Sequence, residues 1–253
     1  MEKVRNFIIV VVLIVCGSLA GKLVGSLQNQ NMQSSYSSVK TQDLSLTEED
    51  MNKVIALLNR NKLFKTMLEL NPDYRQELKK DMLNVVKDKP WFLDKVRKGT
   101  LTYDEIEGKL PSTERELGKY IVKAPDEELY QTLLVEFKHA KKNKCQVYPL
   151  TNEDREETAN AKTKMILAAY NTPYQGKAIS SQKVEEITKK ILENYKKNGG
   201  DMNKIAIMSG LKAGYLTSAD KCQVMTDFFE ATLSLPKKET VMFYRANGQY
   251  FTM

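Results

Sequence analysis

The sequence predicts a mainly α-helical protein: a multi-helix compact domain with a short C-terminal β-hairpin, preceded by an N-terminal signal or anchor segment. Three observations predict this class. An aliphatic run opens the chain, apolar residues then recur at three- and four-residue spacing, and capping motifs precede most of these stretches. The expected parts are an export or anchor segment at 1–27, a flexible polar linker at 28–43, a helical domain at 44–235 and a hairpin tail at 236–253.

The first residues are typical of an export signal. Lys3 and Arg5 precede an apolar run over residues 7–15, and Ser18-Leu19-Ala20 places small side chains where a signal peptidase would cut. The positive charges hold the N-terminus on the cytoplasmic side. We therefore expect an exported, periplasmic protein, either soluble or tethered to the inner membrane by this segment.

A retained anchor is the main alternative to cleavage. The stretch from residue 7 to about residue 27 is long enough to span a hydrocarbon core of about 30 Å. Gly17, Gly21 and Gly25 repeat at four-residue spacing, a pattern that lets two spanning helices approach closely. Lys22 argues against a span, and a lipid-modified Cys16 is a third alternative.

The first half of the helical domain divides into short helices. Residues 47–50 (Thr-Glu-Glu-Asp) resemble a capping box before an apolar stripe, Pro72 suits a first helical position, and Gly99 is a stop signal. Residues 102–105 and 113–116 are further capping-box matches, with Pro111 between them. The first helix expected here ends near Leu58. The next three cover 62–70, Pro72 to Lys89, and Trp91 to about Lys98. Two more start at the two later capping boxes.

The second half of the domain carries longer helices. Pro125 precedes one with leucines at helical spacing, and residues 142–150, which hold Cys145, are expected to form a loop. Capping residues Thr151, Ser180 or Ser181, Asp201 and Thr217 mark the later starts. The expected helices cover 126–141, 151 to about 170, 182–197, 202–212 and 218–234.

The C-terminal tail has a different pattern. β-branched and aromatic residues flank Asn247-Gly248, the strongest two-residue hairpin signal. An isolated hairpin is barely stable in water, so it must pack on the helical body or extend a partner's sheet. The tail residues that we consider as interaction candidates are Phe243, Tyr244, Tyr250 and Phe251.

Cysteine usage fits an oxidising compartment. With Cys16 in the leader, Cys145 and Cys222 form an even pair, and we predict a disulfide between them. It would close a loop of about 77 residues, a stabilisation of ~4 kcal/mol in the chain-entropy model. The alternative is a reactive Cys145 that uses His139, but a spacing of six residues is poor for that contact on a helix.

The net charge of +7 is modest, and most lysines lie among acids at helical spacing. The densest basic stretch ends with Lys141, Lys142 and Lys144, which either complement a helix C-terminus or bind anionic lipid, glycan or an acidic partner. No aromatic interleaving accompanies it, so we expect no nucleic-acid partner.

Motifs for catalysis or cofactors are missing from the sequence. It has one histidine and no CxxC or HExxH zinc signature, no phosphate-binding glycine loop and no Gly-x-Ser-x-Gly, so no cofactor or metal is expected. Acids at 105, 107, 114 and 116 could form the carboxylate pair of a glycan-cleaving enzyme, although capping and solvent exposure explain them as well. Aromatic residues that could line a ligand groove are Trp91, Tyr170 and Tyr174.

The function expected from these patterns is non-catalytic. The export segment, the linker and the aromatic tail favour an interaction or accessory subunit of the cell envelope with a protein partner, in a membrane-associated assembly. An envelope hydrolase acting on glycan or peptide is the first alternative, and a binder of anionic lipid or glycan surfaces is the second.

Overall fold

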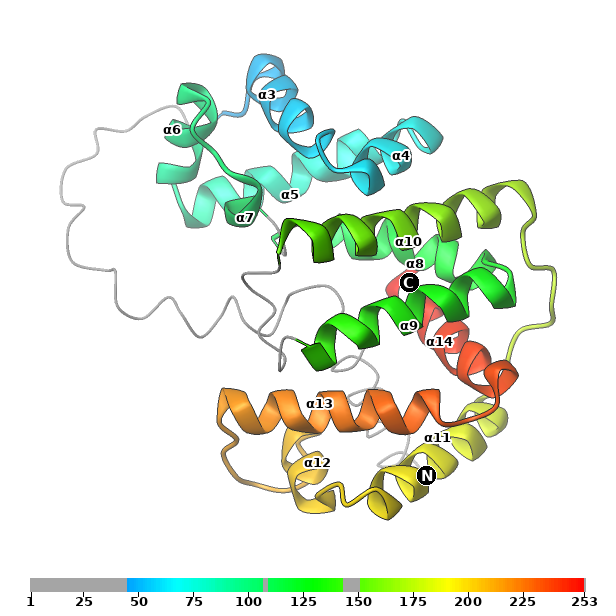
Figure 1. Ribbon diagram of the computed structural model, residues 1–253. Coiled ribbons are helices and arrows are strands. Elements are labelled where there is room, and N and C mark those ends of the chain that lie inside the picture. Colours follow the sequence, from blue (N-terminus) through cyan, green and yellow to red (C-terminus); the bar gives the residue numbers. More distant parts are fainter. Residues whose placement is uncertain (1–44, 107–108, 143–150, 253) are drawn as a thin grey trace. The chain divides into compact units, whose positions relative to one another are not determined.

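The computed structural model describes residues 45–106, 109–142 and 151–252, and within these ranges it contains twelve helices and no strand (Figure 1). The mainly helical class is therefore confirmed. The described residues form two compact units, which meet in sequence between Glu116 and Leu117. No helix in the described ranges is both long and apolar enough to cross a membrane, and the expected segments at 1–27 and 28–43 lie outside them.

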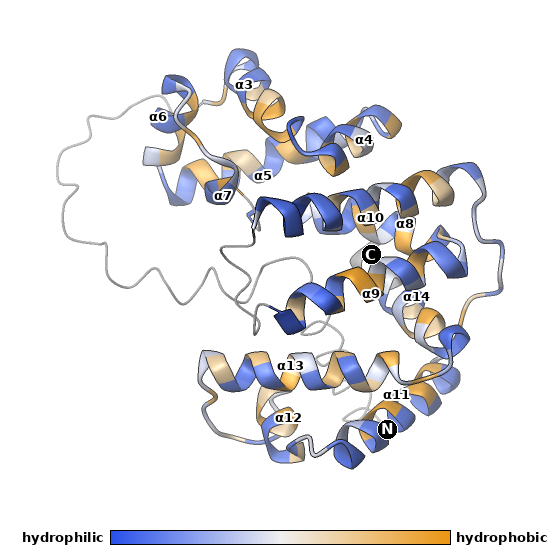
Figure 2. Cartoon of the chain, viewed as in Figure 1, coloured by the Kyte–Doolittle hydropathy of each residue, from blue (hydrophilic) through white to orange (hydrophobic). Residues whose placement is uncertain are grey.

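The N-terminal unit consists of short helices. In chain order they are α3 (Glu48–Leu58), α4 (Lys62–Leu70), α5 (Tyr74–Asp88), α6 (Trp91–Lys98), α7 (Tyr103–Ile106) and the start of α8 (Pro111–Lys123). Amphipathic faces, visible as orange and blue sides of the helices in Figure 2, direct one stripe of each helix inward. The fully buried side chains of this unit include Met51, Leu58, Met67, Leu78, Met82 and Phe92.

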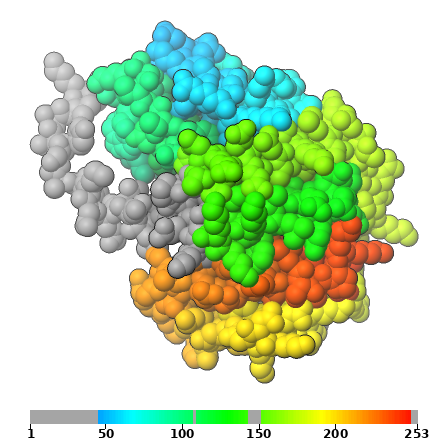
Figure 3. Space-filling view, viewed as in Figure 1, coloured from blue at the N-terminus to red at the C-terminus, as the bar shows by residue number. Residues whose placement is uncertain are grey.

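The C-terminal unit holds the longer helices. After the rest of α8 come α9 (Asp126–Lys142), α10 (Asn152–Asn171), α11 (Ser181–Lys197), α12 (Met202–Met208), α13 (Ser218–Leu233) and α14 (Lys237–Thr252). An aromatic column joins Tyr195, Phe228 and Phe243, whose successive ring centroids are 6.5 and 6.3 Å apart. In the space-filling view, side chains of α9 (green), α14 (red), α13 (orange) and α11 (yellow) lie directly against one another (Figure 3).

The C-terminal tail is a helix instead of the expected β-hairpin. α14 packs against α9, α11 and α13, and all of residues 240–248 except Met242 are buried. A helix buried on nearly every side shows no amphipathic period, which is why its sequence resembled a strand pattern. Gly248 serves close packing here: a Cβ at this position would lie 3.0 Å from Ile121 Cγ2. The Asn-Gly pair therefore lies within the helix.

The start of α8 also differs from the expected one. The helix begins at Pro111, and Thr113, expected as a cap, lies inside its first turn. The reason is a carboxylate from another helix: Asp81 on α5 accepts a hydrogen bond of 2.7 Å from the backbone N of Ser112. This acid satisfies one of the free N–H groups at the start of α8, as a local cap would.

The helix expected over 202–212 ends early. α12 stops at Met208, because Gly210 adopts a left-handed conformation (φ +71°) and the amides of Leu211 and Lys212 turn back to the carbonyl of Ala206 at 2.9 and 3.1 Å. This is the geometry of a glycine helix stop.

Candidate functional site

A pocket of about 210 Å³ lies in the N-terminal unit, between α3, α6 and the turn that follows α6. Most of its lining is apolar, and two cationic residues border it, Lys53 on α3 and Arg60 in the turn after α3. The lining residues are Lys53, Val54, Ala56, Leu57, Arg60, Val96, Gly99 and Leu101.

Helical spacing places the α3 residues on this side. Lys53, Ala56 and Leu57 stand at i, i+3 and i+4 of α3, so they share one face of the helix, and Arg60 follows in the turn after its end. Val54 also lines the pocket and is only 1% exposed, so it belongs to the core as well. The pocket therefore lies where the buried side of α3 meets its solvent-exposed side.

Polar contacts fix the two helices that form the pocket. Thr47 and Asp50 cap α3 reciprocally, with two hydrogen bonds of 3.1 Å. Arg97 on α6 lies 3.5 Å from the Asp50 carboxylate and donates to the Ser45 carbonyl at 3.1 Å. The hydrogen bonds from Thr47, together with the Arg97 charge, hold the pKa of Asp50 below its ordinary value despite its burial. The start of α3 is therefore tied to the end of α6.

Gly99 shapes the turn after α6, which lines the pocket together with α3 and α6. It ends α6 in the left-handed region (φ +68°), and the Thr100 amide returns to the Lys95 carbonyl at 3.0 Å. No atom would obstruct a Cβ at Gly99, so the requirement is conformational and not steric. The turn directs the chain back so that Leu101 reaches the pocket.

The two cations differ in how they are used. Lys53 pairs with Glu49 at 3.0 Å and donates to the Arg97 carbonyl at 3.1 Å. Arg60 is exposed, and its side chain makes no ion pair or hydrogen bond with any described residue. No carboxylate, thiol, hydroxyl or imidazole lines the pocket. It can bind an apolar group with an adjacent negative charge, but it offers no general acid or base.

The basic stretch at the end of α9 is paired within its own unit. Lys141 lies 3.0 Å from Glu230 and Lys142 lies 2.9 Å from Asp154. Lys144 is outside the described residues. Phe243 and Tyr244 are core residues, exposed by 0% and 2%. The structure describes no side chain for Tyr250 or Phe251.

His139 lies between two acids at the junction of α9 and α10. Its exposed fraction is 4%, and its Nδ1 and Nε2 are each 3.0 Å from a carboxylate oxygen, of Asp154 and Glu157 respectively. The hydrogen bond from Lys142 holds the pKa of Asp154 at about 2. This cluster joins two helices, and no group of three or more metal-ligating side chains occurs in the described part of the chain.

Cys222 lies near the start of α13. The other two cysteines, Cys16 and Cys145, lie outside the described residues, so no complete pair is described and the Cys145–Cys222 bridge stays a prediction. The same holds for a reactive Cys145 and for helix packing through Gly17, Gly21 and Gly25.

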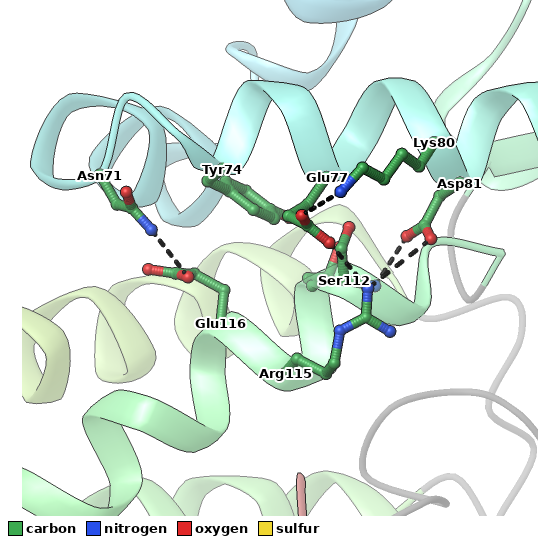
Figure 4. A network of polar contacts seen from close by, with 9 residues as sticks. Asn71, Tyr74, Glu77, Lys80, Asp81, Ser112, Arg115 and Glu116 are labelled. Carbon is green, nitrogen blue, oxygen red and sulfur yellow. Dashed lines mark hydrogen bonds and ion pairs between the residues drawn. The ribbon is translucent and has the colours of Figure 1, made fainter. Parts of the chain in front are cut away.

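The acids proposed as a catalytic pair have structural contacts. Glu105 accepts from the Thr102 amide at 3.0 Å and pairs with Lys95. Glu116, 3% exposed, accepts from Asn71 at 3.0 Å in the polar network between α5 and α8 (Figure 4). Glu107 lies outside the described residues, and Glu114 is on α8.

Tyr74 and Thr113 are joined by a hydrogen bond of 2.7 Å. In the same network Arg115 donates to Glu77 at 3.3 Å (Figure 4). Burial raises the pKa of Tyr74 well above its ordinary value. Because Tyr74 is only 1% exposed, the network's tyrosine is out of reach of a substrate. The polar contacts therefore hold α8 on α5.

The aromatic residues expected to line a groove belong to two different units. Trp91 is on α6 of the N-terminal unit, whereas Tyr170 and Tyr174 belong to the C-terminal unit. Tyr170 is 58% exposed, and the Tyr174 ring stacks 3.7 Å from the guanidinium of Arg245.

Comparisons with protein-family models, with curated proteins and with solved structures find no match to this chain. The chemistry of the α3–α6 pocket therefore carries the functional argument. Reading the sequence alone missed this pocket. Its only sequence signal was the set of apolar and basic residues on one face of α3, followed by a glycine stop after α6.

Proposed function

We propose that the protein is an exported, non-catalytic subunit of the cell envelope that binds a protein partner through the α3–α6 pocket. The observation that carries this proposal is the pocket's composition. Apolar walls give affinity by burying an apolar group, and cations at the rim select a neighbouring negative charge. None of its side chains except the two cations could take part in proton transfer or nucleophilic attack, so binding is the chemistry that it supports best.

The pocket's size favours a protein partner over a free small molecule. Pockets that enclose small ligands measure about 300–1,000 Å³, and this one has about 210 Å³. Such a space suits one anchoring side chain of a larger surface, as in the small pockets at the centres of protein interfaces. The partner segment that fits has an apolar side chain with an aspartate, glutamate or C-terminal carboxylate close by.

The envelope location rests on the sequence of the first 43 residues. An aliphatic run behind two positive charges delivers the following chain to the outer side of the membrane, and a polar spacer of residues 28–43 would let a tethered body reach a neighbouring protein. An even pair of cysteines in the mature chain agrees with an oxidising compartment.

The test is affinity capture of the full chain from detergent-solubilised envelopes, with cross-linking and quantitative mass spectrometry. Ala56→Phe fills the pocket from an exposed position, and Arg60→Gln removes the free cation. Asn84→Phe and Lys87→Gln are the controls: they introduce the same new residues, a phenylalanine and a glutamine in place of a cation, at exposed positions of α5 that do not line the pocket.

We expect Ala56→Phe to lower recovery of a stoichiometric partner about tenfold and Arg60→Gln about threefold, with neither control changing it. Equal recovery by pocket and control variants would refute the role of the pocket. The absence of any stoichiometric partner with the unmodified chain would refute the proposed function itself.

A further inference from the structure

Exposed apolar side chains recur along residues 202–215 of the C-terminal unit. Seven large apolar side chains are more than one-third exposed among the described residues, and three of them fall within residues 202–215. Met202 is 38% exposed, Leu211 51% and Tyr215 81%. Scattered single residues of this kind need no explanation, but Leu211 and Tyr215 are exposed on the same short loop, and exposed apolar groups of this kind mark sites of interaction.

The loop of residues 209–215 is held at both ends. At its start, the turn after α12 fixes the amides of Leu211 and Lys212 on the Ala206 carbonyl. At its end, Leu216 is 5% exposed and anchors the chain in the core, and Thr217 then caps α13. The apolar side chains between these points are thus presented by a fixed backbone.

The loop of residues 209–215 carries one positive charge, Lys212, and no acidic residue. Between Asp201 and Asp220 the chain has no acidic residue. Asp201 is used as the cap of α12, and Asp220 pairs with Lys204 at 2.6 Å. Lys212 is exposed on the loop, where it donates to Asn203 at 3.0 Å and so links the loop to the start of α12.

We infer that this loop docks on the anionic surface of a lipid bilayer. Leu211 and Tyr215 enter the boundary between headgroups and acyl chains, where tyrosine is enriched, and Lys212 meets the lipid phosphates. This docking is independent of the α3–α6 pocket, which lies in the other unit.

A bilayer fits the loop better than a protein partner does. The loop offers apolar side chains and a cation on a long aliphatic stem, and this combination suits an interface that is apolar below and anionic above. A protein interface normally adds a pocket or directional polar contacts at its centre. No pocket described in the structure is lined by these residues.

The experiment places a fluorescent reporter on the loop of the full chain. The single tryptophan is first removed by Trp91→Phe, and Tyr215→Trp is then added. The protein is mixed with vesicles of phosphatidylcholine containing about one-third phosphatidylglycerol, with bromine-labelled acyl chains as quencher. The matched control is Tyr170→Trp in the same background, because Tyr170 is also well exposed and lies in the same unit.

We expect the reporter at 215 to lose more than about half of its emission in these vesicles, and the reporter at 170 to keep it. Adding Lys212→Glu or Leu211→Asp to the Tyr215→Trp protein should restore the emission, as should vesicles without phosphatidylglycerol. The N-terminal segment is present in every sample and cannot account for a difference between them. Equal quenching at 215 and 170, or none at 215, would overturn the inference. A blue shift at 215 with envelope proteins but not with lipid would assign the loop to a protein partner instead.

Discussion

Replacing Asp81 by alanine tests whether a distant carboxylate fixes the start of α8. Asp81 is 6% exposed and accepts a hydrogen bond of 2.7 Å from the amide of Ser112, a residue that is itself only 2% exposed. Without the carboxylate this buried amide has no replacement partner in the first turn of the helix.

The expected loss follows from these contacts. Leaving a buried amide unpaired costs about 1–3 kcal/mol, and removing a helix cap costs about 0.5–2 kcal/mol. Both values describe the loss of the same hydrogen bond, so they are not added. Arg115 lies 4.0 Å from Asp81 but is 45% exposed, so this pair adds at most about 0.5 kcal/mol. We expect Asp81→Ala to lower the free energy of unfolding by about 2 kcal/mol.

The assay is urea unfolding of the full chain at pH 7, together with hydrogen exchange at the Ser112 amide. Asp88→Ala is the matched control, since Asp88 is exposed at the other end of the same helix. Asp81→Asn keeps an acceptor oxygen and should lose less than alanine does. The reasoning fails if Asp81→Ala and Asp88→Ala agree within about 0.5 kcal/mol, or if exchange at Ser112 is unchanged.

Three further predictions concern the C-terminal unit. Phe243→Ala should lower the free energy of unfolding by about 3–5 kcal/mol in urea, because the ring is fully buried in the aromatic column; a loss below about 1 kcal/mol would place it outside the core. The hydrogen bond from Lys204 lowers the pKa of Asp220 from 3.8 to about 2 in the folded state, so its stabilisation is complete above the unfolded value and is lost as the pH falls towards 2. Asp220→Asn should flatten that part of a plot of Tm against pH, and an unchanged slope would contradict the assignment. Lys142→Gln should raise the pKa of Asp154 from about 2 towards its ordinary value, as measured by NMR titration, whereas Lys164→Gln on the exposed side of α10 should leave it unchanged.

The sequence correctly predicted the helix starts that are capped by a side chain directly before the helix. Thr47, Thr151, Ser180 and Thr217 were all expected as caps, and each side chain accepts a hydrogen bond from an amide three residues ahead. The partners lie within one turn of the chain, so the sequence contains the whole interaction.

Features that depend on contacts between residues far apart in sequence could not be predicted in this way. The first turn of α8 is satisfied by Asp81, 31 residues earlier, so the start at Pro111 could not be found from neighbouring residues. The pocket depends in the same way on α3 and α6, which are far apart in sequence and are brought together in part by Arg97. Its residue types were visible in the sequence, but their common location was not.

By itself, the sequence determined the helical class, most helix boundaries and the residues that cap them, because 3.6-residue periodicity and capping are properties of short segments. Only the tertiary structure decided that residues 237–252 form a helix. An isolated hairpin could bury one face, whereas α14 buries Val241, Phe243 and Asn247 at once among three neighbouring helices. That burial outweighs the local strand and turn preferences of the same residues, and it exists only once the other helices have assembled.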